Sequence, residues 1–83
     1  MEDLKQLREK IDGIDKEIVK LLHTRFDIVK QVKQLKASHH VPVLDSKREE
    51  IILKRFEQEP YKREITAVYK AILTVSKDLQ KVK

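Results

Sequence analysis

The chain has 83 residues, of which 40% are hydrophobic and 40% charged, and a formal net charge of +5. It contains no cysteine, which excludes a disulfide framework and a thiolate metal site. No apolar run reaches the length of a signal-peptide core or a membrane span. We therefore expect a cytoplasmic protein that does not bind a membrane, built as a single domain over residues 1–83.

The composition predicts an all-α fold. The chain has two Phe, two Tyr, no Trp, one Gly and two Pro. Sheet proteins usually carry more aromatic residues and more turn glycines than this. Helices are therefore the expected elements throughout the chain.

The first predicted helix organises the rest of the chain. Apolar residues recur at every third or fourth position from Leu4 to Leu35, which is the period of one continuous helix. We expect it to run from about Asp3 to about Ala37, a length of roughly 50 Å at ~1.5 Å per residue. Pro42 lies beyond its end, and proline disfavours the helical conformation in the residue before it.

Two shorter helices are predicted after residue 44. The second begins with Asp45 or Ser46 as its N-cap and runs to about Gln58, where Pro60 closes it. The third starts within residues 61–63 and continues to the end of the chain. Because the two short helices together match the length of the first, we expect them to lie along it.

One copy of such a chain can bury little apolar surface. Its long apolar seam would stay exposed to water if nothing covered it. Two copies packed along the long helix would bury this seam. The sequence therefore predicts an intertwined helical homodimer.

A buried cation interrupts the apolar seam. Arg25 takes the place of an apolar residue, and an arginine remains charged in a protein, so its burial requires an anion. Lys36 lies eleven residues further on, about three helical turns, and projects to nearly the same side. Together the two cations favour a site for an anionic ligand. The alternatives are an internal salt bridge for Arg25 and a solvated position in the last helical turn for Lys36.

Polar residues recur on the inner faces of the other two helices. Each alone could be a helix cap, a surface pair or a satisfied polar group of the core. Together with the two cations they would line one polar cavity. The set comprises Arg25, Lys36, Arg48, Glu49, Ser76 and Gln80.

The residue types in this set favour binding of a small polyanion. They supply cations and hydrogen-bond donors but no cysteine nucleophile and no Ser/His pair, so such a site would act by orientation and electrostatics. His39 and His40 are adjacent but have no further ligands nearby in the sequence. A metal site usually needs three or four ligands, so neither a metal nor another cofactor is expected.

The ordered motifs resemble the all-α, or type II, chorismate mutases, which include short bacterial enzymes and domains fused to prephenate dehydratase, prephenate dehydrogenase or DAHP synthase. The resemblance covers nearly the whole chain. It implies conversion of chorismate to prephenate by a [3,3] rearrangement, in phenylalanine and tyrosine biosynthesis, within an intertwined dimer that uses no cofactor. The matching positions are Leu7-Arg8-Glu9-Lys10-Ile11 with Asp15, then Arg25, Lys36, Pro42-Val43-x-Asp45-x-x-Arg48-Glu49 and Ser76-x-x-x-Gln80.

The resemblance implies that Arg8 and Arg25 bind the two carboxylates of the substrate, and that Ser76 adds a carboxylate contact. Arg8 precedes Arg25 by seventeen residues, roughly 25 Å along an unbroken helix. These two residues of one chain cannot hold the same small molecule. If Arg8 contributes to a site, the site belongs to the partner subunit.

The resemblance also implies roles for the other positions. Lys36 and Gln80 would bind the ether oxygen, and Glu49 with Asp45 would bind the region of the ring hydroxyl. Arg48 would brace Glu49 and the substrate. Gln80 can donate a hydrogen bond without being protonated, so we expect activity to change little between mild acid and neutral pH on account of this position.

Other functions remain open at this stage. An isochorismate pyruvate lyase shares the fold and a similar cation-rich site, and a regulatory domain could bind chorismate or prephenate without turnover. A basic helical module for nucleic acid or a helical partner is the alternative without catalysis. Acidic residues interspersed with the basic ones and the scarcity of aromatics disfavour nucleic acid. The family also leaves open whether the chain acts alone or as part of a larger fused enzyme.

Overall fold

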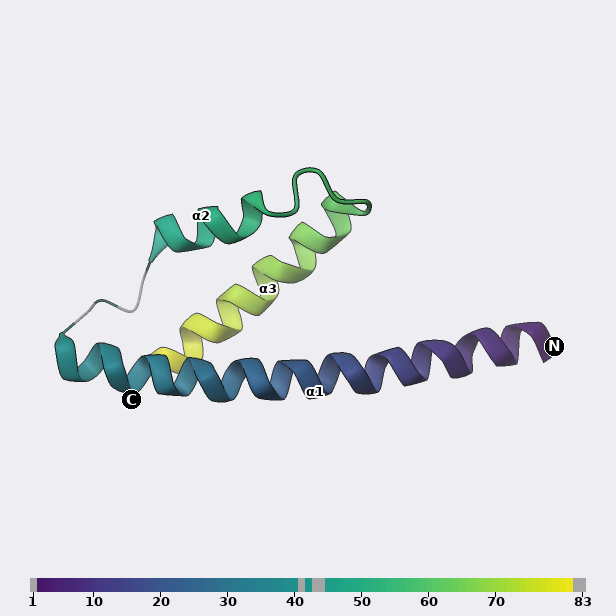
Figure 1. Cartoon of the computed structure of the whole chain (residues 1–83), viewed down its shortest axis with the longest axis horizontal. Helices are drawn as coiled ribbons and strands as arrows, with labels where there is room; N and C mark the ends of the chain where they lie inside the picture. The colour runs from purple at the N-terminus through teal and green to yellow at the C-terminus, as the bar shows by residue number, and fades with distance from the viewer. Residues whose placement is uncertain (1, 41, 43–44, 82–83) are drawn as a thin grey trace.

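The computed structural model describes residues 2–40, 42 and 45–81, which form three α-helices (Figure 1). Helix α1 spans Glu2–His39, α2 spans Ser46–Lys54 and α3 spans Lys62–Gln80. The predicted all-α fold with one long helix is confirmed. None of these described helices has both the length and the apolar character needed to cross a membrane.

Helix α1 is continuous over 38 residues, and each of its two ends lies within two residues of the predicted position. Glu2 and Asp3 lie in its first turn and Lys36 and His39 in its last, a distribution of charge that complements the helix dipole. Gly13 does not interrupt it, since a lone glycine costs only about 1 kcal/mol relative to alanine.

Helix α2 begins at a side-chain cap. The Asp45 carboxylate accepts a hydrogen bond from the backbone N–H of Arg48 at 3.0 Å, which satisfies one of the amides left unpaired in a first helical turn. Of the two predicted caps, the structure uses Asp45, while Ser46 is the first residue of the helix. This cap positions the start of α2 beside the cavity described below.

The predicted end of the second helix is wrong. Helix α2 stops at Lys54, four residues before Gln58, because the amides of residues 55–57 bond to carbonyls three residues earlier, as in a 3₁₀ turn. The Phe56 ring packs on Tyr69 of α3, with 4.7 Å between ring centroids. Tyr61 then takes a left-handed conformation with φ of 60° and reverses the chain into α3. The third helix was expected to continue to the end of the chain, and this expectation is wrong, because α3 ends at Gln80 and Lys81 is extended. Residues 82–83 lie outside the described residues.

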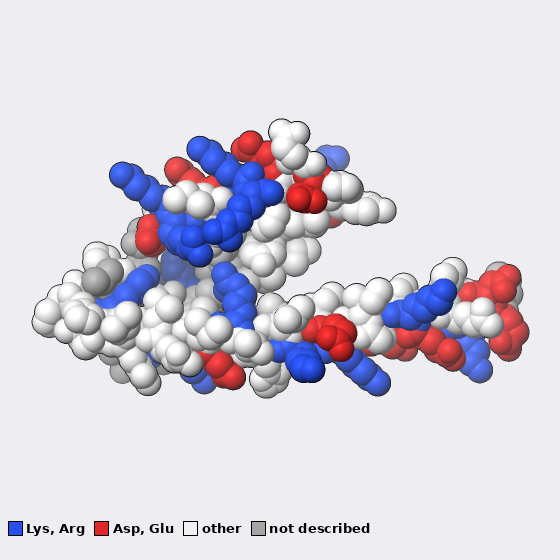
Figure 2. Space-filling view, in the orientation of Figure 1, with Lys and Arg blue, Asp and Glu red and all other residues white. Residues whose placement is uncertain are grey.

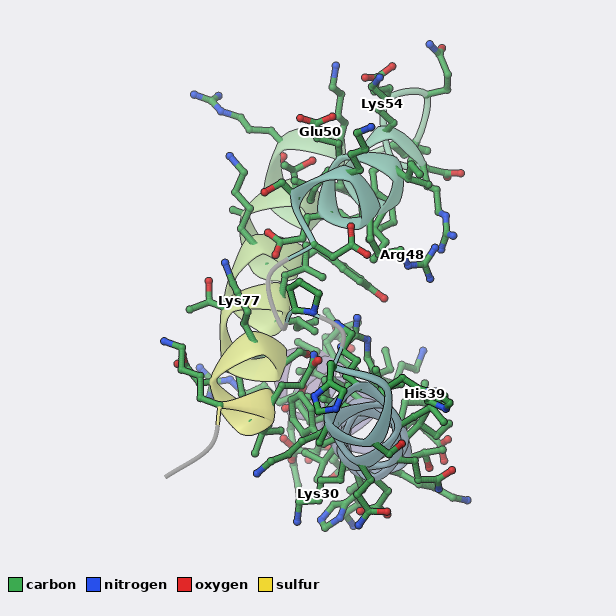
Figure 3. The ribbon with its side chains drawn as sticks, turned by 90° about the vertical axis from the view of Figure 1, so that its left-hand side faces the viewer. Lys30, His39, Arg48, Glu50, Lys54 and Lys77 are labelled. Carbon is green, nitrogen blue, oxygen red and sulfur yellow. The ribbon has the colours of Figure 1, made fainter. Side chains whose placement is uncertain are left out.

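Only one of the short helices lies against α1. Helix α3 packs on α1 and α2 packs on α3, whereas α1 and α2 make no close backbone contact within the described residues. Figure 1 shows α3 crossing obliquely from α2 to the C-terminal half of α1, and Figure 3, seen nearly along α1, shows α3 to one side of the other two helices. The expectation that both short helices lie along α1 is wrong. Nine-residue α2 buries only Ile52 of its apolar residues, and among the described helices it packs on α3.

The chain alone has almost no core. Among the described residues only Ile52, Leu73 and Ser76 are buried, with exposures of 6%, 7% and 5%, and α1 contains no buried residue. Most of the apolar seam predicted along α1 is exposed to solvent. The exposed residues of the seam are Leu4, Leu7, Ile11, Ile14, Ile18, Leu21, Ile28, Val32 and Leu35.

Candidate functional site

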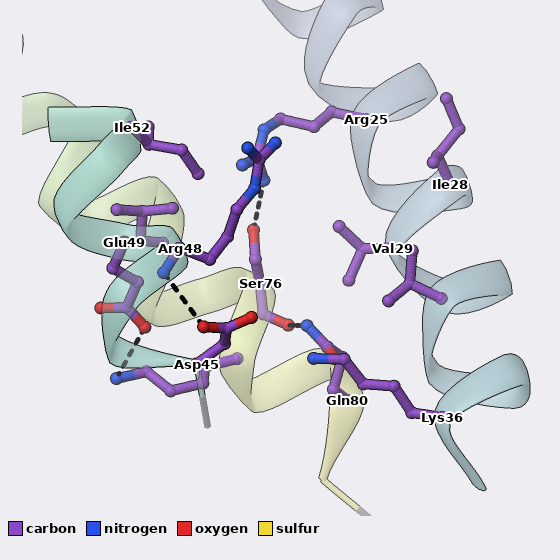
Figure 4. Close-up of a pocket in the computed structure, with 13 residues that line it drawn as sticks. Arg25, Ile28, Val29, Lys36, Asp45, Arg48, Glu49, Ile52, Ser76 and Gln80 are labelled. Atoms are coloured by element: carbon purple, nitrogen blue, oxygen red, sulfur yellow. Dashed lines mark hydrogen bonds and ion pairs between the residues drawn. The ribbon is translucent and has the colours of Figure 1, made fainter. Parts of the chain in front are cut away.

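A cavity of about 430 Å³ lies between the C-terminal half of α1, the start of α2 and the C-terminal half of α3 (Figure 4). This volume is in the range of small-molecule sites. Its apolar wall consists of Ile28, Val29, Val32, Ile52 and Leu73. Its polar wall consists of Arg25, Lys36, Asp45, Arg48, Glu49, Ser76, Lys77 and Gln80.

The structure brings seven of the eight predicted site residues together in this cavity; Arg8 is the exception. Arg8 lies on the N-terminal half of α1, which projects away from the other two helices (Figure 1). This agrees with the expectation that Arg8 cannot serve the site of its own chain. The binding roles of all eight residues stay predictions.

Arg25 is held by a short chain of hydrogen bonds. Its Nη1 donates to Ser76 Oγ at 2.5 Å, and Ser76 Oγ donates to the Ile72 carbonyl oxygen at 2.7 Å. Ser76 is buried, so it fixes the guanidinium group from within the protein. A guanidinium has five N–H donors, and most of them remain available to a ligand.

Arg25 carries a charge that no described residue neutralises. Among the residues that the structure describes, no carboxylate forms an ion pair with it. The alternative interpretation of this arginine, an internal salt bridge, therefore has no support in the described part of the chain. The guanidinium therefore presents its positive charge to the cavity, where an anionic ligand would be favoured.

The Gln80 side chain also has unused hydrogen-bonding capacity. Its Nε2 donates to the Ser76 carbonyl oxygen at 3.5 Å, a long bond, and this nitrogen carries a second hydrogen. Its Oε1 is buried and has no hydrogen-bond partner in the described part of the chain. A buried polar atom without a partner costs about 1–3 kcal/mol, so a ligand that donates a hydrogen bond to this oxygen would be stabilised here.

Lys77 is the site residue that the sequence reasoning missed. Its Nζ lies 3.5 Å from Oε2 of Glu49 and joins α3 to the start of α2. A signal was present in the sequence, because Lys77 follows Leu73 by four residues and precedes Gln80 by three. This spacing places all three on one side of a helix.

The cavity carries a net positive charge. Its four Lys and Arg residues outnumber its two carboxylates, which leaves a formal charge of +2. Figure 2 shows Lys and Arg side chains gathered around the hollow between α2 and α1. A concave site with a net positive charge attracts anions.

Fold and site together define a small all-helical domain with a cation-lined cavity. Residues 7–81 match the family profile described as chorismate mutase type II. The chain belongs to this family.

Relatives span bifunctional and separate enzymes. The chain is 32% identical to the bifunctional chorismate mutase/prephenate dehydratase of Aquifex aeolicus over 98% of its own length, and 37% identical to the T-protein of Haemophilus influenzae over 81%. It is 36% identical to the chorismate mutase of Methanocaldococcus jannaschii over 70%. The matched parts cover 25%, 18% and 59% of these three relatives, so the chain spans less than two thirds of each.

A solved structure shares the whole fold. A conserved hypothetical protein from Pyrococcus furiosus superimposes with a TM-score of 0.83 at 38% sequence identity. The match covers 94% of this chain and 95% of that one.

Proposed function

We propose that this chain is a chorismate mutase, which isomerises chorismate to prephenate in phenylalanine and tyrosine biosynthesis and acts in the cytoplasm. Its membership of the type II family supports this function. The observation that carries the proposal is Arg25, which faces the cavity beside Ser76 with no carboxylate partner among the described residues. Its charge and its donors suit a carboxylate of the substrate.

The proposed reaction needs no proton transfer and no covalent intermediate. Catalysis then consists of holding the substrate in its compact reactive conformation and stabilising the charge that develops on the ether oxygen. Lys36 on α1 and Gln80 on α3 both line the cavity and supply the donors for this oxygen (Figure 4). Preorganised donors of this kind usually contribute the largest catalytic effect.

The remaining polar groups orient the substrate. Arg25, supported by Ser76, would bind one carboxylate of chorismate. Asp45, Arg48 and Glu49 line the α2 side of the cavity, where Asp45 and Glu49 can accept a hydrogen bond from the ring hydroxyl. The net charge of +2 balances that of a dianionic substrate.

We also propose that the working form is an intertwined homodimer, for which the exposed seam of α1 is one line of support. A second is a largely apolar groove of about 380 Å³ between α1 and the N-terminal half of α3. Arg25 lines both this groove and the site cavity. A partner helix seated in the groove would therefore reach the site, and could bring its Arg8.

The charges along α1 favour an antiparallel arrangement of the two long helices. Residues 2–17 contain six Asp and Glu against four Lys and Arg, a net charge of −2, whereas residues 18–40 contain five Lys and Arg against one Asp, a net charge of +4. Antiparallel packing brings the acidic half of each helix beside the basic half of the other. Such complementarity sets orientation more than affinity.

The test of the proposed function is turnover of chorismate by the purified chain. Loss of substrate is followed by ultraviolet absorbance, and NMR identifies the product as prephenate. Release of pyruvate from isochorismate would favour the lyase instead, and tight binding with feeble turnover would favour a regulatory domain. Light scattering is expected to give twice the chain mass of 9.9 kDa.

The variant Gln80→Glu tests the proposed donor to the ether oxygen. The amide donates at any pH, whereas a carboxyl group donates only when it is protonated. We expect the variant to lose at least about tenfold in kcat/KM between pH 5 and pH 8, since the introduced group ionises as pH rises from a pKa near or above about 4.3. The wild type should vary little over this range. A flat pH profile in the variant would contradict the role of Gln80.

A further inference from the structure

Lys77 connects the two shorter helices at the edge of the cavity. Its Nζ lies 3.5 Å from Oε2 of Glu49, and the two side chains are 31% and 30% exposed. Lys77 comes from α3 and Glu49 from the first turn of α2. Since α2 makes no close backbone contact with α1 in the described residues, its place at the site depends on α3.

Glu49 meets two conflicting demands in the proposed reaction. It must stay a carboxylate that faces the cavity if it is to accept a hydrogen bond from the ring hydroxyl. The same negative charge repels a dianionic substrate, and a half-exposed glutamate has several side-chain rotamers open to it. A cation beside it, on a helix that also lines the cavity, addresses both demands.

We propose that Lys77 is a positioning residue for the mutase reaction. Through its ion pair it holds the Glu49 carboxylate at the cavity and offsets its charge, so that the site accepts the ring hydroxyl and the dianion together. This inference rests on the proposed function and adds a residue to it. Lys77 acts on the substrate through Glu49.

A surface ion pair at the C-terminal end of α3 provides a matched control. Lys81 Nζ lies 3.2 Å from Oδ1 of Asp78, with side chains 65% and 60% exposed. Neither residue lines the cavity. Removing either lysine should have little effect on thermal unfolding, because exposed and half-exposed ion pairs contribute little to stability. If only the variants of Lys77 lose activity, the loss then comes from a change at the cavity and not from a loss of stability.

The experiment compares steady-state kinetics with chorismate for Lys77→Met, Lys77→Gln, Lys77→Arg and Lys81→Met. We expect the two neutral variants of Lys77 to lose about tenfold in kcat/KM, mainly through a higher KM, which is the coupling typical of contacting residues. Lys77→Arg should recover to within about threefold of the wild type, since it keeps the charge. Lys81→Met should match the wild type.

A double-mutant cycle separates action through Glu49 from direct action. In a Glu49→Gln background the Lys77→Met substitution should lower kcat/KM less than about twofold, because the partner charge is already absent. An equal loss in both backgrounds, or a failure of Lys77→Arg to recover activity, would overturn the inference. Kinetics equal to those of the wild type in Lys77→Met and Lys77→Gln would also overturn it. In each of these cases the proposed function stands as long as the unchanged chain converts chorismate. An inactive wild type overturns both.

Discussion

Arg25→Ala is expected to lower kcat/KM for chorismate about 100- to 1,000-fold, the loss of about 3–4 kcal/mol typical of a truncated charge pair in a desolvated site. The guanidinium lines the cavity and is oriented by Ser76. Removing it takes away the ligand for a substrate carboxylate. Steady-state kinetics measure the loss, and circular dichroism should show unchanged helix content, because Ser76 keeps its bond to the Ile72 carbonyl oxygen.

Two further variants help to interpret this result, one at Arg25 and one at another arginine. Arg25→Lys keeps the charge but not the planar fork, so an intermediate activity is expected. Arg63→Ala removes an exposed arginine of α3 that does not line the cavity, and should leave kcat/KM unchanged. Wild-type kinetics in Arg25→Ala would contradict the assignment of this cavity as the active site.

Mixing two inactive variants is expected to restore activity if Arg8 serves the partner subunit. Arg8→Ala and Arg25→Ala are each nearly inactive in this scheme. A mixed dimer of the two has one site with both arginines and one site with neither. Since half of the dimers in an equal mixture are mixed and half of their sites are intact, refolding them together should give about a quarter of the wild-type activity.

The controls for this experiment establish that mixed dimers form and that position matters. Each variant refolded alone should stay inactive, and differently tagged chains allow the mixed dimers to be purified and assayed directly. Lys10→Ala, a cation from the same half of α1, should behave as the wild type does. Purified mixed dimers without activity would show that Arg8 does not complete the site of the neighbouring chain.

The helical architecture followed from local patterns. The apolar period from Leu4 to Leu35 and the restriction before Pro42 predicted α1 to within two residues at each end. The end of α2 was missed, because the change to 3₁₀ turns at residues 55–57 and the packing of Phe56 on Tyr69 depend on contact with α3. A local pattern does not report such a contact.

The site was predicted as a set of residues more fully than as a geometry. Face periodicity and the family resemblance selected seven residues that the structure brings to one cavity. Lys77 also lines the cavity and was not among the predicted residues. Its pairing with Glu49, 28 positions away in the sequence, follows only from how α2 packs on α3.

The sequence by itself determined the order of the three helices, the extent of the first, the seam and the family, because these depend on periodicity and on an ordered set of residue types. The tertiary structure decided that Arg25 meets Ser76, 51 residues away, and has no carboxylate partner among the described residues. It also decided that α3 alone packs on α1 and that α1 buries none of its residues. The physical reason is that pairing and burial depend on which distant faces meet, and that is set by the packing of whole helices.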